Sequence, residues 1–344
     1  MSNDFGGLFG NESTKKRLSA AVLSGTLPHA FLIDGPVGSG KTVLALHLAA
    51  ALNCENKGTS HPLPCLKCNT CRRIFEGSYT DIKFLKKQSG KATLGTDEVK
   101  RFKDDMFLSA TESEYKIYVI DEAETLTPQA QNALLTVMEE PPPRVIIMLL
   151  SSASDKILTT IKSRAQYIAM ERFSRPMLGK YLKTHFDEAM AMSERDPEGF
   201  ASVTVKAGGC IGRALTLLDS DGARRVQAER ECVTRFVKAL DPRVTYSELY
   251  LAAKDFPTPR QELISTLEDV LLSIGDLIKC HCAADGASLE FYTSVSEAKD
   301  IARGFSSGRL LRIYDLVLEA HAQITKNAMA GAVMTALLAR IKQI

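Results

Sequence analysis

An eight-residue motif at residues 35–42 constrains the fold of this chain more than any other feature. It reads Gly-Pro-Val-Gly-Ser-Gly-Lys-Thr and fits the phosphate-loop pattern G-x-x-x-x-G-K-[ST] without a mismatch. The apolar run 30–33 before it predicts a β-strand, and residues 43–52 after it predict an α-helix. A loop in this setting turns backbone N–H groups toward phosphate oxygens, and the helix N-terminus adds partial positive charge. The motif therefore predicts an α/β nucleotide-binding domain.

The residue types in this loop each suit phosphate binding. The glycines let the backbone turn, the Lys41 ammonium neutralises charge near the β- and γ-phosphates, and the Thr42 hydroxyl ligates Mg²⁺. The predicted nucleotide-binding residues of the loop are Gly35, Gly38, Ser39, Gly40, Lys41 and Thr42. We expect them to bind ATP or ADP together with Mg²⁺.

A pair of carboxylates follows the apolar run 117–120, which predicts a central strand of a parallel sheet. An ATP site needs a carboxylate that holds Mg²⁺ through its water shell and a base that polarises an attacking water. Asp121 is the candidate metal carboxylate, and Glu122 is the candidate base. The nearby Glu124 is interpreted as surface charge.

Four of the eight cysteines form a metal-binding pattern. Cys54, Cys65, Cys68 and Cys71 are spaced C-x₁₀-C-x₂-C-x₂-C, whereas the other four cysteines are scattered. Four thiolates at such spacings can surround Zn²⁺ as a tetrahedron. The intervening segment 55–64 contains glycine and two prolines and has no apolar periodicity, so it needs a cross-link to fold. We predict a structural zinc module, with His61 as an alternative fourth ligand.

Strand and helix signals alternate along the first half of the chain, which predicts a parallel sheet with helices on both faces. The expected strands are 30–33, 82–85, 116–121, 144–150 and 166–170, and the expected helices are 11–24, 43–52, 97–107 and 127–140. After about residue 170 the strand signal disappears and apolar residues recur at helical spacing. We therefore expect an α/β domain at 1–169 with the zinc module 54–71 inserted, then all-α parts at 170–222 and 223–344.

Composition limits the function classes less than the motifs do. A net charge of +2 over 344 residues is too small to argue for nucleic-acid binding from charge alone. The N-terminal residues lack a basic start followed by an apolar run, and no apolar segment is long enough to span a bilayer. We expect a cytoplasmic protein with no membrane partner.

Taken together, the motifs resemble those of a known family. The phosphate loop and the four-cysteine insertion are followed, in order, by Asp121-Glu122-Ala123, Asn132-Ala133-Leu134-Leu135, Glu139-Glu140-Pro141-Pro142 and Ser163-Arg164. This series is similar to that of bacterial sliding-clamp loader subunits of the AAA+ class. The resemblance covers about residues 5–216, and the final helix 325–338 is similar to the end of the family's helical collar. It implies that 170–222 form a helical lid and that 223–344 form a collar and oligomerisation domain.

The resemblance also implies partners and roles. Clamp loaders are five-subunit rings, containing gamma/tau and delta subunits, that use ATP to place the sliding clamp of DNA polymerase III on primed DNA during replication. Ser152 lies where the family has a polar sensor of the γ-phosphate. Arg164 matches the arginine that reaches into a neighbouring subunit's ATP, which stabilises charge in phosphoryl transfer only within the assembled ring.

Within the family, departures from the motor pattern favour the delta-prime type. Motor subunits carry an arginine where this chain has Gly212, and Arg213 is rotated by about 100° around a helix relative to that position. Thr136 replaces a lysine, and the chain ends at the collar. The intact phosphate loop and Asp121-Glu122 pair keep a gamma/tau-like motor, which hydrolyses ATP itself, as the alternative. A stand-alone AAA+ ATPase fits less well because of the collar-like C-terminal third.

Overall fold

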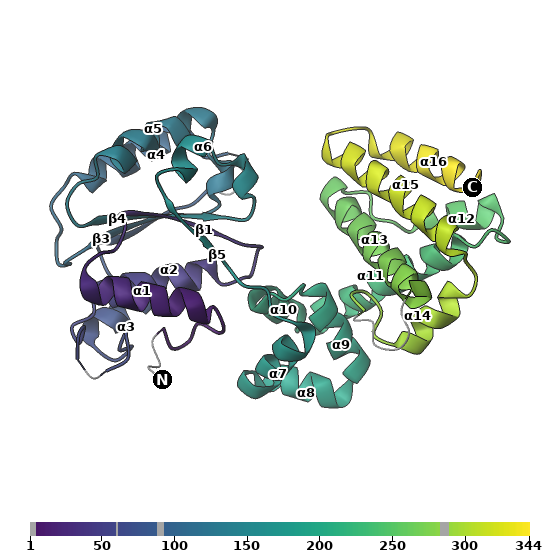
Figure 1. Ribbon diagram of the computed structural model, residues 1–344, viewed down its shortest axis with the longest axis horizontal. Helices are drawn as coiled ribbons and strands as arrows, with labels where there is room; N and C mark the ends of the chain where they lie inside the picture. The colour runs from purple at the N-terminus through teal and green to yellow at the C-terminus, as the bar shows by residue number, and fades with distance from the viewer. Residues whose placement is uncertain (1–4, 60, 88–92, 283–288) are drawn as a thin grey trace. The chain divides into compact units, whose positions relative to one another are not determined.

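The computed structural model describes residues 5–59, 61–87, 93–282 and 289–344, and the chain divides into two compact units (Figure 1). The first unit comprises Met1–Phe173 together with Cys210–Arg213. The second comprises Ser174–Gly209 and Ala214–Ile344. The helices expected as lid and those expected as collar therefore share the second unit, and the finer three-part division stays a prediction.

A five-stranded parallel sheet forms the centre of the first unit. Its strands are β1 (Ala30–Asp34), β2 (Ile82–Leu85), β3 (Lys116–Ile120), β4 (Val145–Ser151) and β5 (Gln166–Ala169), in the order β2-β3-β4-β1-β5. All the neighbouring strands pair in parallel. The predicted α/β class is thus confirmed. Because all five strands run the same way, the segments that follow them gather at one edge of the sheet.

Helices cover both faces of this sheet, as Figure 1 shows. They are α1 (Glu12–Ser24), α2 (Lys41–Leu52) and α3 (Asn69–Phe75) on one face, and α4 (Thr96–Met106), α5 (Pro128–Glu139) and α6 (Thr159–Lys162) on the other. Alternate residues of each strand feed the two cores: Phe31 and Ile33 pack toward α2, whereas Leu32 packs toward α5. This is why the strands read as continuous apolar runs.

Local signals explain where several elements begin. Thr127 caps α5 by accepting a hydrogen bond from the backbone N–H of Ala130 (3.2 Å), and Pro128 occupies the first turn. Strand β3 ends at Ile120, so Asp121 lies in the following turn, not in the strand as expected. Two short 3₁₀ helices, η1 (Ala123–Thr125) and η2 (Ser154–Lys156), follow β3 and β4.

The described part of the second unit is entirely helical. Its helices are α7 (Arg175–His185), α8 (Asp187–Arg195), α9 (Pro197–Lys206), the end of α10 (Ile211–Leu217), α11 (Ser220–Ala239), α12 (Tyr246–Lys254), α13 (Arg260–Cys282), α14 (Val295–Ala302), α15 (Ser307–Thr325) and α16 (Ala330–Ile341). Its main core packs α13 against α15, where Leu267, Ile274 and Ile313 are fully buried. Helix α9 packs on α11, and Lys206 pairs with Glu229 and Asp269.

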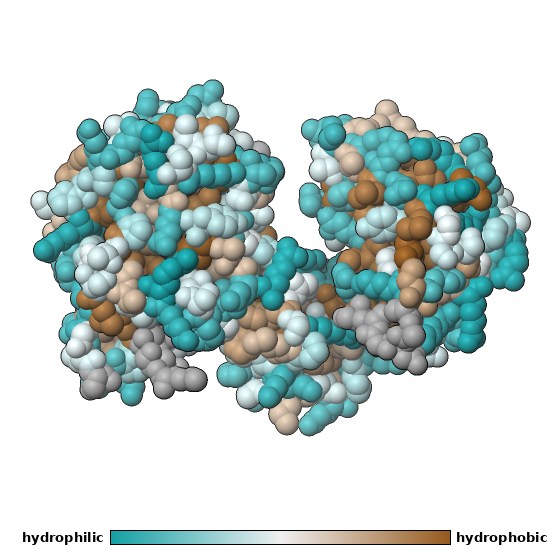
Figure 2. Space-filling model, in the orientation of Figure 1, coloured by the Kyte–Doolittle hydropathy of each residue, from teal (hydrophilic) through white to brown (hydrophobic). Residues whose placement is uncertain are grey.

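The visible surface is mostly hydrophilic, with scattered apolar side chains (Figure 2). Among the residues that the structure describes, no helix is both long enough and apolar enough to span a bilayer.

Candidate functional site

Three polar segments meet at the edge of the sheet where its strands end. Gly35 follows β1, Asp121 follows β3, and Ser152 follows β4, whose last residue, Ser151, pairs with Asp34 of β1. Ligands of parallel α/β sheets bind outside the carboxyl ends of the strands. The fold therefore brings the predicted phosphate loop, acidic pair and polar sensor to one edge.

The backbone of the phosphate loop has the conformation that its glycines permit. Gly38 and Gly40 have φ angles of 80° and 92°, a region that residues with a Cβ rarely adopt. Helix α2 begins directly after Gly40, and its first N–H groups have no side-chain cap. Ser39 is buried, and its hydroxyl has no partner within the described parts of the chain. An uncapped helix N-terminus next to unpaired donors is a favourable place for phosphate oxygens.

Lys41 lies at the centre of this edge. Its ammonium group donates to the carbonyl oxygens of Gly35 (2.6 Å) and Pro36 (3.0 Å) and to the hydroxyl of Ser152 (3.1 Å). Burial lowers the pKa of Lys41, and the carboxylates of Glu124, Asp121 and Asp34 oppose this shift. A cation held beside three carboxylates can exchange its present carbonyl partners for phosphate oxygens.

The two residues of the acidic pair point in different directions. The Asp121 carboxylate opposes the lowering of the Lys41 pKa, and it also pairs with Lys86 at 3.5 Å. Glu122 has a left-handed backbone (φ 50°), its side chain is 54% exposed, and it pairs with Lys87 at 3.1 Å. Asp121 thus lies where a metal carboxylate is expected. Glu122, the candidate base, faces a lysine of the neighbouring strand end.

Glu124 is part of the site, so its interpretation as surface charge was wrong. One carboxylate oxygen accepts a hydrogen bond from the backbone N–H of Ser152 (3.2 Å), and the other is buried without a partner among the described residues. Asp34, which sequence reasoning did not single out, accepts hydrogen bonds from Tyr167 (2.7 Å) and Ser154 (2.9 Å). No local sequence signal distinguishes either carboxylate from an ordinary strand-end residue.

Gly212 packs against the phosphate loop. Its backbone N–H donates to the carbonyl oxygen of Gly38 at 2.9 Å. A Cβ at residue 212 would lie 3.0 Å from the Gly38 Cα, and a Cβ at residue 38 would lie 2.4 Å from the backbone nitrogen of Arg213. The two backbones touch only because both residues are glycines. At the position where motor subunits are expected to carry an arginine, any side chain would therefore require the backbone of the phosphate loop to shift.

The structure does not bring Arg164 near the phosphate loop. Phe31 pairs with Gln166 and Asp34 with Ala169, so Arg164 precedes β5 at the amino edge of the sheet, whereas Gly35 lies beyond the carboxyl edge. An offset of about six residues at about 3.3 Å each separates the two by about 20 Å along the strand direction. The Arg164 side chain is 37% exposed and pairs with Glu139 at 2.7 Å.

The four predicted cysteine ligands form a cluster. The sulfur atoms of Cys54, Cys65, Cys68 and Cys71 all lie within 4.8 Å of one another. Tetrahedral Zn²⁺ with bonds of about 2.3 Å requires sulfur atoms about 3.8 Å apart. His61 is exposed and does not belong to this group. The donor set and its spacing fit a structural zinc ion.

Hydrogen bonds within the cluster lower the pKa of the Cys65 thiol. The backbone N–H of Cys68 and the side chain of Asn56 donate to the Cys65 sulfur at 3.3 and 3.4 Å. Burial opposes the thiolate, but these bonds and one from the Lys67 backbone lower the pKa of Cys65 to about 6. Burial, together with the neighbouring Cys68, raises the pKa of Cys71. A bound cation would offset the cost of ionising the deeper thiols.

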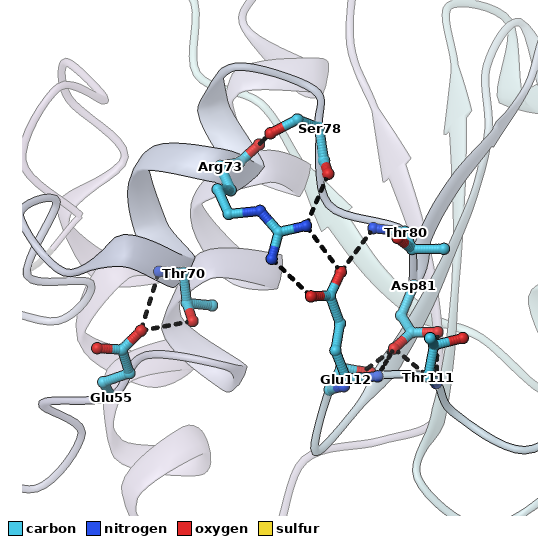
Figure 3. Close-up of polar contacts among 9 residues, drawn as sticks. Glu55, Thr70, Arg73, Ser78, Thr80, Asp81, Thr111 and Glu112 are labelled. Atoms are coloured by element: carbon cyan, nitrogen blue, oxygen red, sulfur yellow. Dashed lines mark hydrogen bonds and ion pairs between the residues drawn. The ribbon is translucent and has the colours of Figure 1, made fainter.

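Charged side chains fasten the cysteine module to the sheet domain (Figure 3). Arg73 of α3 forms two hydrogen bonds with Glu112, at 2.5 and 3.0 Å, and Glu112 also accepts from the backbone N–H of Thr80. Within the module, Glu55 accepts from the backbone and hydroxyl of Thr70. The module is therefore tied both internally and to the loop before β3.

Comparison with known proteins finds sequences similar to this chain among the subunits of DNA polymerase III. Residues 10–174 match the family described as DNA polymerase III, delta subunit. The tau subunit of DNA polymerase III from Bacillus subtilis (strain 168) is 35% identical over 216 residues, which cover 62% of this chain and 37% of that protein. The gamma/tau subunit from Mycobacterium tuberculosis (strain ATCC 25618 / H37Rv) is 28% identical over 316 residues, covering 91% and 49%.

The chain thus spans between about a third and a half of the length of these two relatives. Among solved structures, a DNA polymerase III gamma subunit-related protein from Thermotoga maritima is 19% identical with a TM-score of 0.38, covering 95% of this chain and 98% of that one. The sequence matches, rather than this structural similarity, relate the chain to DNA polymerase III subunits.

Proposed function

We propose that this protein is a delta-prime-like subunit of the DNA polymerase III clamp loader. In this role it binds ATP or ADP at its phosphate loop and supplies Arg164 to the nucleotide of a neighbouring subunit. Its partners are gamma/tau and delta in a five-subunit ring, and the complex loads the sliding clamp on primed DNA in the cytoplasm. The all-α lid at 170–222 and collar at 223–344 belong to the same proposal.

The position of Arg164 carries this proposal. It lies at the amino edge of the sheet, and the phosphate loop lies at the carboxyl edge. The separation of about 20 Å along the strands is much longer than an arginine side chain. Arg164 therefore cannot contact a nucleotide bound to its own loop, but it is exposed enough to contact one bound to another subunit. A guanidinium offered in this way stabilises the charge that develops during phosphoryl transfer.

The chain's own loop is suited to holding a nucleotide. Lys41 and the N-terminus of α2 are placed to bind phosphate oxygens, and Thr42 with Asp121 would hold Mg²⁺. Magnesium, when bound, neutralises phosphate charge. The close packing of Gly212 on Gly38 means that the lid arginine of a motor subunit would displace the phosphate-loop backbone, which favours slow turnover in this chain. Zinc at Cys54, Cys65, Cys68 and Cys71 has a structural role in this scheme.

A gamma/tau-like motor that hydrolyses ATP itself is the second candidate. Two observations favour it: the similar proteins are named gamma and tau subunits, and Asp121 lies beside Lys41 as a metal carboxylate should. In this case Glu122 would leave Lys87 and act as the base. The two candidates differ in the site of hydrolysis: the delta-prime-like subunit assists hydrolysis of a neighbour's ATP, whereas the motor hydrolyses the ATP bound to its own phosphate loop.

ATP turnover by reconstituted clamp loaders tests the proposal. Complexes carry the wild-type chain, Lys41→Ala, Arg164→Ala or, as a matched control, Arg101→Ala on the exposed surface of α4. Because a trans-acting arginine contributes about 10³-fold or more at the site it serves, we expect Arg164→Ala to reduce turnover sharply. Lys41→Ala and Arg101→Ala should change it little. A large loss with Lys41→Ala and none with Arg164→Ala would establish the motor instead.

A further inference from the structure

The turn after β3 directs two glutamates to different partners. Glu122 has the left-handed backbone, and the 3₁₀ helix η1 follows at once. As a result the Glu122 side chain reaches Lys87, and Glu124 reaches the backbone of Ser152 beyond β4. Glu122 thus connects the end of β3 to the segment after β2, whereas Glu124 connects it to the segment after β4.

Glu124, Ser152 and Lys41 form a continuous chain of polar contacts. The backbone N–H of Ser152 donates to Glu124 at 3.2 Å, and the hydroxyl of the same serine accepts from the Lys41 ammonium at 3.1 Å. Three separate segments, the turns after β3 and β4 and the phosphate loop, therefore meet at Ser152. Since a phosphate-loop lysine reaches toward the β- and γ-phosphates, Ser152 lies on the side of the terminal phosphate.

The surroundings of Glu124 indicate that this contact is specific. The residue is half-buried, and its second carboxylate oxygen is shielded from solvent without a partner in the described parts of the chain. Of the carboxylates that oppose the lowering of the Lys41 pKa, Glu124 acts most strongly. The one hydrogen bond described for this carboxylate is the one from Ser152, so its main effect is on the position of that residue.

We propose that Glu124 is a positioning residue that holds the turn after β4, through the Ser152 N–H, so that the Ser152 hydroxyl faces the terminal phosphate of ATP. This inference rests on the proposed nucleotide site. ADP lacks the terminal phosphate and depends on the phosphate loop alone. Glu124 therefore sets the preference of the site for a nucleoside triphosphate over a diphosphate.

Calorimetric titration of the full chain with Mg²⁺-ADP and with the non-hydrolysable analogue AMP-PNP tests this role. Glu124→Ala removes the acceptor, whereas Glu124→Gln retains one acceptor oxygen for Ser152 and loses the charge. We expect Glu124→Ala to reduce the AMP-PNP-to-ADP affinity ratio about fivefold, the value of one hydrogen bond, with ADP affinity unchanged. Glu124→Gln should retain most of the ratio. Glu140→Ala, at the exposed residue that follows α5, is the matched surface control.

The other outcomes contradict the inference in distinguishable ways. An unchanged ratio in Glu124→Ala, or an equal loss for both nucleotides together with a lower melting temperature, means that Glu124 is structural. A ratio lost in Glu122→Ala and kept in Glu124→Ala assigns the role to the other glutamate. If the wild-type chain binds neither nucleotide, the proposed nucleotide site fails and this inference fails with it.

Discussion

Asp81 offers a quantitative test of how the cysteine module is attached to the sheet domain. Its side chain is buried just before β2, and three consecutive backbone N–H groups, those of Thr111, Glu112 and Ser113, donate to it at 2.8–3.1 Å. The middle donor belongs to Glu112, which binds Arg73 of α3, the helix that carries Cys71 (Figure 3). Asp81 therefore shapes the loop on which the module docks.

Replacing Asp81 with alanine should lower the free energy of unfolding of the first unit by about 3 kcal/mol. This value is three lost hydrogen bonds at about 1 kcal/mol each, with the N–H groups left without their acceptor. Asp81→Asn should cost only about 1 kcal/mol, because all three N–H groups approach one oxygen that the amide retains. Asp104→Ala, at an exposed position of α4, is the matched control.

Urea unfolding followed by circular dichroism measures these differences, because the chain has no tryptophan to report by fluorescence. Hydrogen exchange of the segment 108–116 should accelerate in Asp81→Ala and show that the effect is local. An Asp81→Ala variant within 0.5 kcal/mol of wild type, or one that leaves this exchange unchanged, would refute the reasoning.

The same carboxylate predicts a pH dependence. Burial opposes the charged form of Asp81, but the backbone donors outweigh it and lower the pKa of Asp81 below its ordinary value. Its stabilisation is therefore fully present above the unfolded-state pKa of about 4 and is lost as the pH falls through the lower folded-state pKa. The stability difference between wild type and Asp81→Asn should be constant from neutral pH to about pH 5 and shrink below about pH 4. A difference that grows on acidification would contradict this sign.

Two further predictions concern the proposed sites. Gly212→Arg introduces the arginine of a motor subunit. It should weaken ADP binding and give no gain in ATP turnover, because a Cβ at residue 212 would lie 3.0 Å from the Gly38 backbone. Faster turnover in this variant would refute the packing argument. Elemental analysis should find one zinc per chain, and Cys71→Ala should lose it and expose the segment 54–71 to proteolysis. Metal-free wild-type protein in which that segment resists proteolysis would contradict the zinc prediction.

The elements that the sequence predicted well are those specified by local patterns. Strand β2 has the expected bounds, β3 ends one residue earlier than expected, and β4 begins and ends one residue later, because buried parallel strands read as unbroken apolar runs. The start of α5 was also predictable, since Thr127 and Pro128 act within a single turn. The cysteine cluster followed from spacing alone, because two-residue gaps leave few ways to place the thiols.

The parts that could not be predicted depend on contacts between distant segments. Glu124 belongs to the site because of the backbone angle of Glu122 and the nearness of Ser152, and neither is encoded by the composition of the turn. The contact between Gly38 and Gly212 joins the phosphate loop to a segment within the expected lid 170–222, far away along the chain. A glycine in a helix start ordinarily indicates flexibility, whereas here it permits close approach of two backbones.

The geometry of a parallel sheet supports the proposal that the Ser163-Arg164 motif serves a neighbouring subunit. A residue that precedes a strand lies at the amino edge, and a phosphate loop that follows a strand lies at the carboxyl edge, so one domain cannot join the two. In the isolated chain Arg164 pairs with Glu139, and an exposed pair of this kind contributes at most about 1 kcal/mol. A neighbour's phosphate carries more charge than this carboxylate and can replace it at little cost. The weak pairing with Glu139 therefore suits an arginine whose proposed partner arrives only when the ring forms.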